Sequence, residues 1–157
     1  MDKKIYFFFV LLFAFSMIIY GKSELTGPIT KEEILEHSPD WQEVIDSYTP
    51  NQDIISELKS IHNEIKIEVF VGTWCPDSKR NVSAYIKIME LVNNSFLTTS
   101  YIGLPRDKDS RQPFIQGKNI IRIPTFIVYV KNQEKGRIVE NPLKSVEEDL
   151  LDIIKSK

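Results

Sequence analysis

The chemistry that this sequence offers centres on Cys75, its only cysteine. Residues 73–80 read Thr-Trp-Cys-Pro-Asp-Ser-Lys-Arg. A Trp-Cys-x-x-Cys run that opens a helix is a dithiol redox motif, and here Ser78 stands in place of the second cysteine. A lone thiolate can attack a disulfide and form a mixed disulfide, but it cannot close an internal disulfide to release itself. The sequence therefore predicts monothiol exchange that needs an external thiol to complete each cycle.

Cys75 is expected at the start of a helix, because Pro76 suits the first helical position. The unpaired N–H groups and the dipole at such a position favour the thiolate. Ser78, three residues on, is expected to direct its hydroxyl or its backbone N–H at the sulfur. Cys75 and Ser78 are therefore the candidate catalytic residues. The alternative is a structural cysteine, since free cysteines are often buried as small hydrophobic residues.

The first residues have the pattern of an export signal. Lys3 and Lys4 precede an apolar run, Ile5–Tyr20, after which the sequence turns polar. This pattern predicts a signal peptide over residues 1–23, with cleavage after Ser23. An uncleaved anchor is the alternative, because no Ala-x-Ala site is present, although a membrane span usually takes about 20 apolar residues. The protein is thus expected to be periplasmic or extracellular, with membrane contact only through residues 5–20 if they are retained.

Composition narrows the range of partners and cofactors. The 157 residues carry a net charge of −2 and a pI of about 5.8, which indicates one domain without a nucleic-acid surface. A single cysteine excludes an intrachain disulfide. His37 and His62 are interpreted as residues near helix ends, and together with one cysteine they make no metal-ligand spacing. We therefore expect neither a metal nor a cofactor.

Capping signals and hydrophobic periodicity divide the rest of the chain. Capping boxes at Thr30 and Ser145 predict two helix starts, and Ser38-Pro39-Asp40 predicts another. Residues 24–63 are expected to form an N-terminal helical extension, and residues 64–157 a domain of alternating elements. The expected segments are a helix over Gln52–His62, strands over Ile65–Gly72, Phe96–Ile102, Thr125–Val130 and Arg137–Glu140, a helix from Pro76 to Val92, a loop over Leu104–Asn119 and a turn over Lys131–Lys135. This order implies a mixed sheet with helices on both faces.

The pattern resembles the thioredoxin-fold family over about Ile65 to Lys155. One motif is Trp74-Cys75-Pro76-Asp77-Ser78-Lys79 at a strand-to-helix junction, and the other is Ile123-Pro124-Thr125 before a hairpin. The resemblance implies an α/β, thioredoxin-like three-layer fold with a central mixed β-sheet, preceded by the signal segment and short helices. It also implies that Pro124 follows a cis peptide bond and faces Cys75. The substrate groove would then be lined by Trp74, Pro76, Ile123 and Pro124.

More narrowly, the chain looks like a bacterial subgroup of thioredoxin-like proteins with a single-cysteine Trp-Cys-x-Asp-Ser motif and a Gly-Arg-Ile-Val-Glu segment, here Gly136–Glu140. Besides Ser78, two features depart from thioredoxins. Val69 stands where thioredoxins carry a buried acid for proton transfer, and strand alternation points the neighbouring Glu68 the other way. The loop before Ile123 is also longer, and its charged part, Arg106 to Arg111, is expected to be solvated.

The leading function is that of an exported thioredoxin-like monothiol protein in cell redox homeostasis. It would exchange with protein or low-molecular-weight thiols and disulfides through Cys75. Such a mechanism suits isomerisation, deglutathionylation-type exchange or substrate capture better than net reduction. The alternative is a non-catalytic thioredoxin-fold binding module in which Cys75 is incidental. A peroxide-reacting thiol is a third reading, but the second motif of peroxidatic enzymes is not evident.

Overall fold

The computed structural model describes residues 23–156. The predicted signal peptide therefore lies, apart from Ser23, outside the described residues. None of the helices within the described part is long and apolar enough to cross a membrane.

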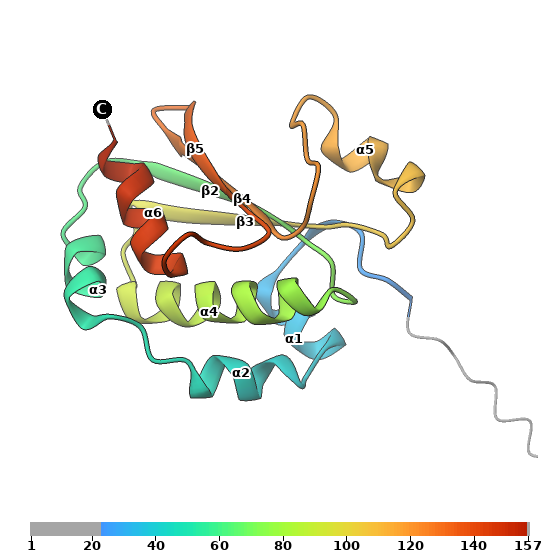
Figure 1. Cartoon of the computed structure of the whole chain (residues 1–157), viewed down its shortest axis with the longest axis horizontal. Coiled ribbons are helices and arrows are strands. Elements are labelled where there is room, and N and C mark those ends of the chain that lie inside the picture. Colours follow the sequence, from blue (N-terminus) through green and yellow to red (C-terminus); the bar gives the residue numbers. More distant parts are fainter. Residues whose placement is uncertain (1–22, 157) are drawn as a thin grey trace, which may run out of the picture.

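The centre of the molecule is a five-stranded mixed sheet with the order β1-β3-β2-β4-β5 (Figure 1). Only β2 and β3 pair in parallel, whereas β1 with β3, β2 with β4 and β4 with β5 are antiparallel. The strands are β1 (Gly27–Ile29), β2 (Ile65–Val71), β3 (Leu97–Gly103), β4 (Thr125–Val130) and β5 (Gln133–Val139). The predicted strands are thus confirmed to within a few residues, whereas β1 is a strand that the sequence did not indicate.

Side-chain alternation along β2 divides the core between the two faces of the sheet. Ile65, Ile67, Val69 and Val71 join a large buried cluster on one face. Phe70 belongs to a smaller cluster on the opposite face, which also contains Cys75 and Ile123. The central strand is therefore apolar along one face, whereas its other face carries Lys66 and Glu68 beside Phe70.

The helices are distributed unequally over the two faces (Figure 1). The long helix α4 (Pro76–Val92) and α6 (Val146–Lys155) pack on the large cluster, and α2 (Trp41–Ser47) and α3 (Gln52–Lys59) contact α4. The opposite face is covered by the segment between β3 and β4, which contains a 3-10 turn (Asp109–Arg111) and the short helix α5 (Gln112–Ile115). The prediction of a plain loop over Leu104–Asn119 was therefore wrong, and this segment supplies the third layer.

The N-terminal region shares the core of the domain. Helix α1 (Lys31–His37) begins at Thr30, whose side chain and Glu33 form the predicted capping box. Fully or almost fully buried residues from α1, α2 and α3 lie in the same cluster as β2 and α4: Ile34, Trp41, Ile45, Ile55 and Leu58. Strand β1 pairs with the edge of the same sheet. The region is thus joined to the rest by hydrophobic packing and by backbone hydrogen bonds.

Some element ends differ from the sequence expectation for local reasons. Helix α2 begins at Trp41 rather than at Pro39, because a turn closes first through the Trp41 amide and the Ser38 carbonyl. Helix α3 ends at Lys59, where Ser60 acts as its C-cap. The β4–β5 hairpin turns over two residues, Lys131 and Asn132, both at positive φ. Such a turn matches the twist of the flanking strands, so β5 begins earlier than expected.

Candidate thiol site

Cys75 is positioned by the junction between β2 and α4. It is the N-cap residue of α4, with extended backbone angles, and Pro76 follows at the first helical turn. The Cys75 amide donates to the Gly72 carbonyl at 2.9 Å, and the Cys75 carbonyl accepts from Lys79 at 3.0 Å. The predicted placement of the cysteine at a helix start is confirmed. Helix N-terminal N–H groups and the dipole of this long helix favour a negative charge here.

The second motif lies directly opposite the sulfur. The peptide bond between Ile123 and Pro124 is cis, as the family resemblance implied. The Cys75 Sγ lies 3.8 Å from the carbonyl oxygen of Ile123, at a distance at which the thiol donates to it. Cys75 is 8% exposed, so the sulfur meets solvent through a restricted opening.

Ser78 is fully buried, and its hydroxyl has a partner other than the sulfur. Its Oγ accepts a hydrogen bond from the Gly72 amide at 3.2 Å. This bond connects the first turn of α4 to the residue that follows β2. The sequence placed Ser78 beside Cys75 as a catalytic candidate, and the structure gives its hydroxyl a contact that braces the turn carrying the cysteine.

Gly72 allows the two motifs to approach each other closely. A Cβ at this position would lie 2.8 Å from Ile123 Cδ1 and 2.9 Å from Trp74 Cε2. Real Cβ atoms do not come this close to other heavy atoms, so any larger residue would displace one of these side chains. The absence of a side chain at Gly72 therefore sets the spacing between the cysteine turn and the Ile123-Pro124 segment.

Trp74 is held in place on the side of the groove by the segment after β3. Its indole N–H donates to the Leu104 carbonyl at 3.0 Å. The guanidinium carbons of Arg106 and Arg111 lie 4.9 and 5.4 Å from the centre of the indole ring. Contacts of this kind stabilise a cation over an aromatic ring. The loop that the sequence predicted to be solvated therefore packs on the tryptophan of the cysteine motif.

The prediction that the charged segment from Arg106 to Arg111 is solvated was wrong for Arg111. Its side chain is buried, with 7% of the residue exposed. The Nε donates to the Pro105 carbonyl at 2.9 Å, and one terminal nitrogen donates to the Arg106 carbonyl at 3.0 Å. No local pattern in the sequence marked this arginine, because its burial depends on how the whole segment folds back over Trp74.

A groove of about 520 Å³ opens at the cysteine. Its walls are formed by Trp74, Cys75, Asp77, Lys108, Arg111, Ile121, Arg122, Ile123 and Glu140. Three of the predicted site residues, Trp74, Cys75 and Ile123, are thus brought together. Pro124 is buried and Pro76 is exposed, and neither forms part of the groove wall. Ile121 is 74% exposed and gives the groove an apolar rim.

Glu68 is on β2, and its side chain lies on the opposite face of the sheet from that of Val69. Its carboxylate contacts Lys118 Nζ at 2.5 Å, Lys66 Nζ at 3.0 Å and the Tyr129 hydroxyl at 3.0 Å. Burial raises the pKa of Glu68, but the hydrogen bonds from Lys118, Lys66 and Tyr129 outweigh burial and lower that pKa overall. Glu68 therefore stays ionised at neutral pH and anchors Lys118, which belongs to the segment that leads to Ile123. The prediction that it points away from the Val69 side is confirmed.

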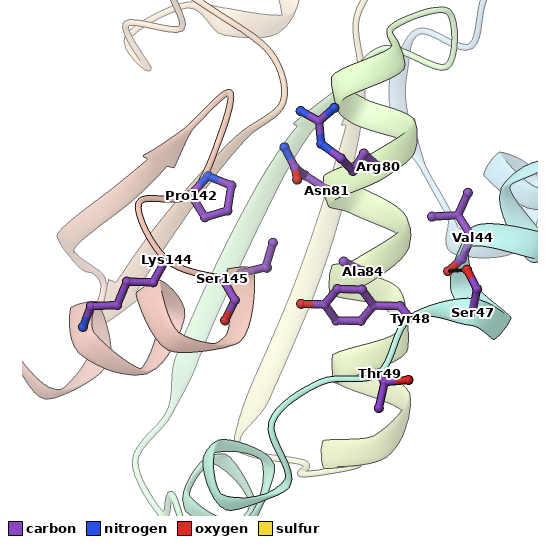
Figure 2. Close-up of a pocket in the computed structure, with 11 residues that line it drawn as sticks. Val44, Ser47, Tyr48, Thr49, Arg80, Asn81, Ala84, Pro142, Lys144 and Ser145 are labelled. Carbon is purple, nitrogen blue, oxygen red and sulfur yellow. Dashed lines mark hydrogen bonds between the residues drawn. The ribbon is translucent and has the colours of Figure 1, made fainter.

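A separate cavity of about 430 Å³ lies on the other side of α4, bordered by α2, the segment after it and the start of α6 (Figure 2). Tyr48 points across it, and its hydroxyl donates to Glu147 at 2.6 Å. Asn81 closes another side by donating to the Glu140 carbonyl at 2.6 Å. None of the residues predicted for the thiol site lines this cavity, which is therefore separate from the groove at Cys75.

The fold and the Cys75–Ile123 pairing define a thioredoxin-like protein. The family model described as Thioredoxin matches residues 29–152. The match covers well over half of the chain, and the chain therefore belongs to the thioredoxin family. The match begins at Ile29, the last residue of β1, and includes the three N-terminal helices as well as the two motifs.

Solved structures show the same architecture at low sequence identity. One is an HIV epitope-scaffold, with 18% identity and a TM-score of 0.63 over 83% of this chain and 93% of that chain. Another is a protein of unknown function from Pseudomonas aeruginosa, with 17% identity and a TM-score of 0.59 over 83% of this chain and 90% of that chain. At such identities the likeness concerns the fold alone. No curated protein is significantly similar to the chain in sequence.

Proposed function

We propose that the protein is an exported monothiol member of the thioredoxin family that exchanges disulfides through Cys75. The observation that carries this proposal is the position of the sulfur. Cys75 is the N-cap residue of α4, and its Sγ lies 3.8 Å from the Ile123 carbonyl oxygen at the border of an open groove. These features place the sulfur at a helix N-terminus and beside a surface for a substrate chain.

The exchange needs two thiolate attacks. The Cys75 thiolate attacks one sulfur of a disulfide, so that a mixed disulfide forms and the other half leaves as a thiolate. A second, external thiolate then attacks the substrate sulfur of that mixed disulfide. Cys75 is released as a thiolate, and the external thiol is now joined to the substrate. The number of disulfides is unchanged, which suits isomerisation or exchange with protein and low-molecular-weight thiols.

The remaining site residues support this cycle by position. Trp74 and Ile123 offer apolar walls for the substrate chain that carries the disulfide. Once Cys75 is in a mixed disulfide, its sulfur no longer donates to the Ile123 carbonyl, which can then accept a hydrogen bond from a substrate N–H. Ser78 braces the cysteine turn through Gly72. With no second cysteine in the chain, the mixed disulfide persists until the external thiol arrives.

The second candidate is a binding module that retains the groove and does not use the thiol. The burial of Cys75 and the engagement of the Ser78 hydroxyl with Gly72 favour it, because neither feature requires a reaction at sulfur. Export is proposed from the charged and apolar pattern of residues 1–23 alone. Cell fractionation with N-terminal sequencing would test it, and a mature end at Glu24 is the expected result.

The decisive experiment is acid-quenched trapping of Cys75 adducts from cells, compared between the wild type and Cys75→Ser. Monothiol exchange predicts disulfide-linked adducts that disappear on reduction and are absent from the serine variant. A reduced, unmodified Cys75 in an exported and folded protein would contradict exchange. Partner binding that survives Cys75→Ser would then favour the binding module.

A further inference from the structure

Arg111 is a buried cation that lacks a carboxylate partner. Within residues 23–156, no carboxylate oxygen lies within 4.0 Å of its guanidinium, which is held by two backbone carbonyls and the Trp74 ring. The Asp107 carboxylate accepts hydrogen bonds from Ser110, and these hydrogen bonds are the main reason that the pKa of Asp107 is lowered. The charge of Arg111 contributes less to that lowering. Buried charges in proteins are normally paired, so a guanidinium on a groove wall without a partner is an unfilled anion contact.

The other charges of the groove are already matched. Asp77 pairs with Arg80 at 2.7 Å, and Glu140 pairs with Arg122 at 2.5 Å. Lys108 is exposed on the same wall as Arg111, and among the described residues it forms no ion pair. The groove that Cys75 lines therefore retains two cations without an ion pair among the described residues, although the whole chain has a net charge of −2.

We propose that this groove selects disulfides that carry a carboxylate near the reacting sulfur, with Arg111 and Lys108 as the recognition residues. This inference rests on the proposed exchange at Cys75. The guanidinium offers a planar fork whose free N–H groups match a carboxylate, whereas the lysine adds a mobile point charge. Trp74 and Arg106 hold the fork in place, so that little ordering is required when the anion arrives. The carboxylate belongs either to an acidic residue flanking a protein cysteine or to a small thiol acid.

The test uses the full-length reduced protein and three disulfides with the same two-carbon arms. These are 3,3′-dithiodipropionate (anionic), 2-hydroxyethyl disulfide (neutral) and cystamine (cationic). The rate of Cys75 modification is followed by intact-protein mass spectrometry, and each rate is divided by that of 2-mercaptoethanol with the same disulfide. We expect the anionic probe to exceed the neutral one by about tenfold, at the low end for a charge-lined cleft, and the ratio to fall with added salt.

Variants assign the effect to the two cations. Lys108→Met removes an exposed side chain, and Arg111→Met removes the fork. Each should lower the anionic-to-neutral ratio several-fold. Lys59→Met, on α3 outside the groove, is the matched control and should leave the ratio unchanged. If Arg111→Met fails to fold, Arg111→Lys replaces it, since a lysine keeps the charge without the fork and should still reduce the ratio. If Lys108→Met and an Arg111 variant both keep the wild-type anionic-to-neutral ratio, the assignment of anion recognition to these two residues is overturned.

The outcomes separate this inference from the proposed function. Equal normalised rates with all three probes overturn anion selection and leave exchange intact. If iodoacetamide alkylates Cys75 but no disulfide reacts, the proposed exchange fails, and the inference fails with it. A second arm compares mixed disulfides of an acidic and of an amidated cysteine peptide. A preference for the acidic peptide supports anion selection in which a polypeptide substrate supplies the carboxylate. A preference confined to the small acid supports anion selection in which a small thiol acid supplies it.

Discussion

The sulfur of Cys75 lies 3.8 Å from the carbonyl oxygen of Ile123, although the two residues are far apart in the chain. The contact joins the start of α4 to the segment before β4. It places an apolar wall and a backbone acceptor beside the thiol. The properties expected of the site follow from this pairing and from the contacts that hold each side of it.

Replacing Cys75 by serine is expected to abolish covalent adducts while leaving the fold intact. A serine hydroxyl does not attack a disulfide at neutral pH, and the residue lies at an element boundary. The thermal midpoint should change by only a few degrees, corresponding to about 1 kcal/mol. Mass spectrometry after incubation with 2-hydroxyethyl disulfide measures the adducts, and circular dichroism measures the midpoint. Adducts that persist in the serine variant would show that another group reacts.

Ser78→Ala should destabilise the protein by about 1–3 kcal/mol, because the buried Gly72 amide would lose the Ser78 hydroxyl as its hydrogen-bond acceptor. Urea unfolding at pH 7 measures this loss. Ser83→Ala is the matched control. Ser83 is equally buried on α4, but its hydroxyl makes no hydrogen bond within the described residues. Its removal should change stability by less than about 0.5 kcal/mol or increase it. Equal losses in the two variants would contradict a bracing role for Ser78.

Ser78→Cys is expected to convert the monothiol into a dithiol. The first turn of α4 places residues 75 and 78 one helical turn apart, on neighbouring positions of the helix surface. Mild oxidation should then form an internal disulfide, detected as a loss of two alkylatable thiols without dimerisation. Reduction of a protein disulfide substrate should increase over the wild type. A variant that stays fully reduced, or oxidises only between molecules, would argue against this placement of the motif.

Lys118→Met should weaken the fold at neutral pH and have less effect in acid. The Glu68 pKa is lowered in the folded protein, so the pairing contributes stability above the ordinary carboxylate pKa. That contribution is lost as the pH falls through the lowered folded value. We expect the free energy of unfolding to fall by about 1–2 kcal/mol at pH 7, a value between those for exposed and for buried ion pairs. The loss is intermediate because the Lys118 side chain is one third exposed and because Lys66 still pairs with Glu68 in the variant. Urea unfolding at pH 7 and pH 3 measures the difference.

Lys144→Met is the matched control for Lys118→Met, because it removes a lysine that forms an exposed ion pair. Lys144 forms an exposed pair with Asp152, with both side chains more than half exposed. Its replacement should cost less than about 0.5 kcal/mol at either pH. A loss for Lys118→Met that does not shrink in acid would mean that packing of the lysine stem, rather than the ion pair, holds the segment.

Much of the local structure could be predicted from the sequence, because its causes are local. The alternation of Ile65, Ile67, Val69 and Val71 fixes β2, and proline after Cys75 fixes the helix start. The capping box at Thr30 starts α1. Each of these signals depends on residues a few positions apart, whose backbone preferences act before any tertiary contact forms.

Tertiary structure alone decided what surrounds the thiol. Ser78 could have faced the sulfur or the turn, and the buried Gly72 amide resolves this choice. Arg111 appeared to be one more charge in a polar loop, but the segment folds over Trp74 and buries it. Strand β1 is only three residues long and exists because β3 presents a free edge. In each case the decisive partner lies far along the chain, where neither spacing nor composition could identify it.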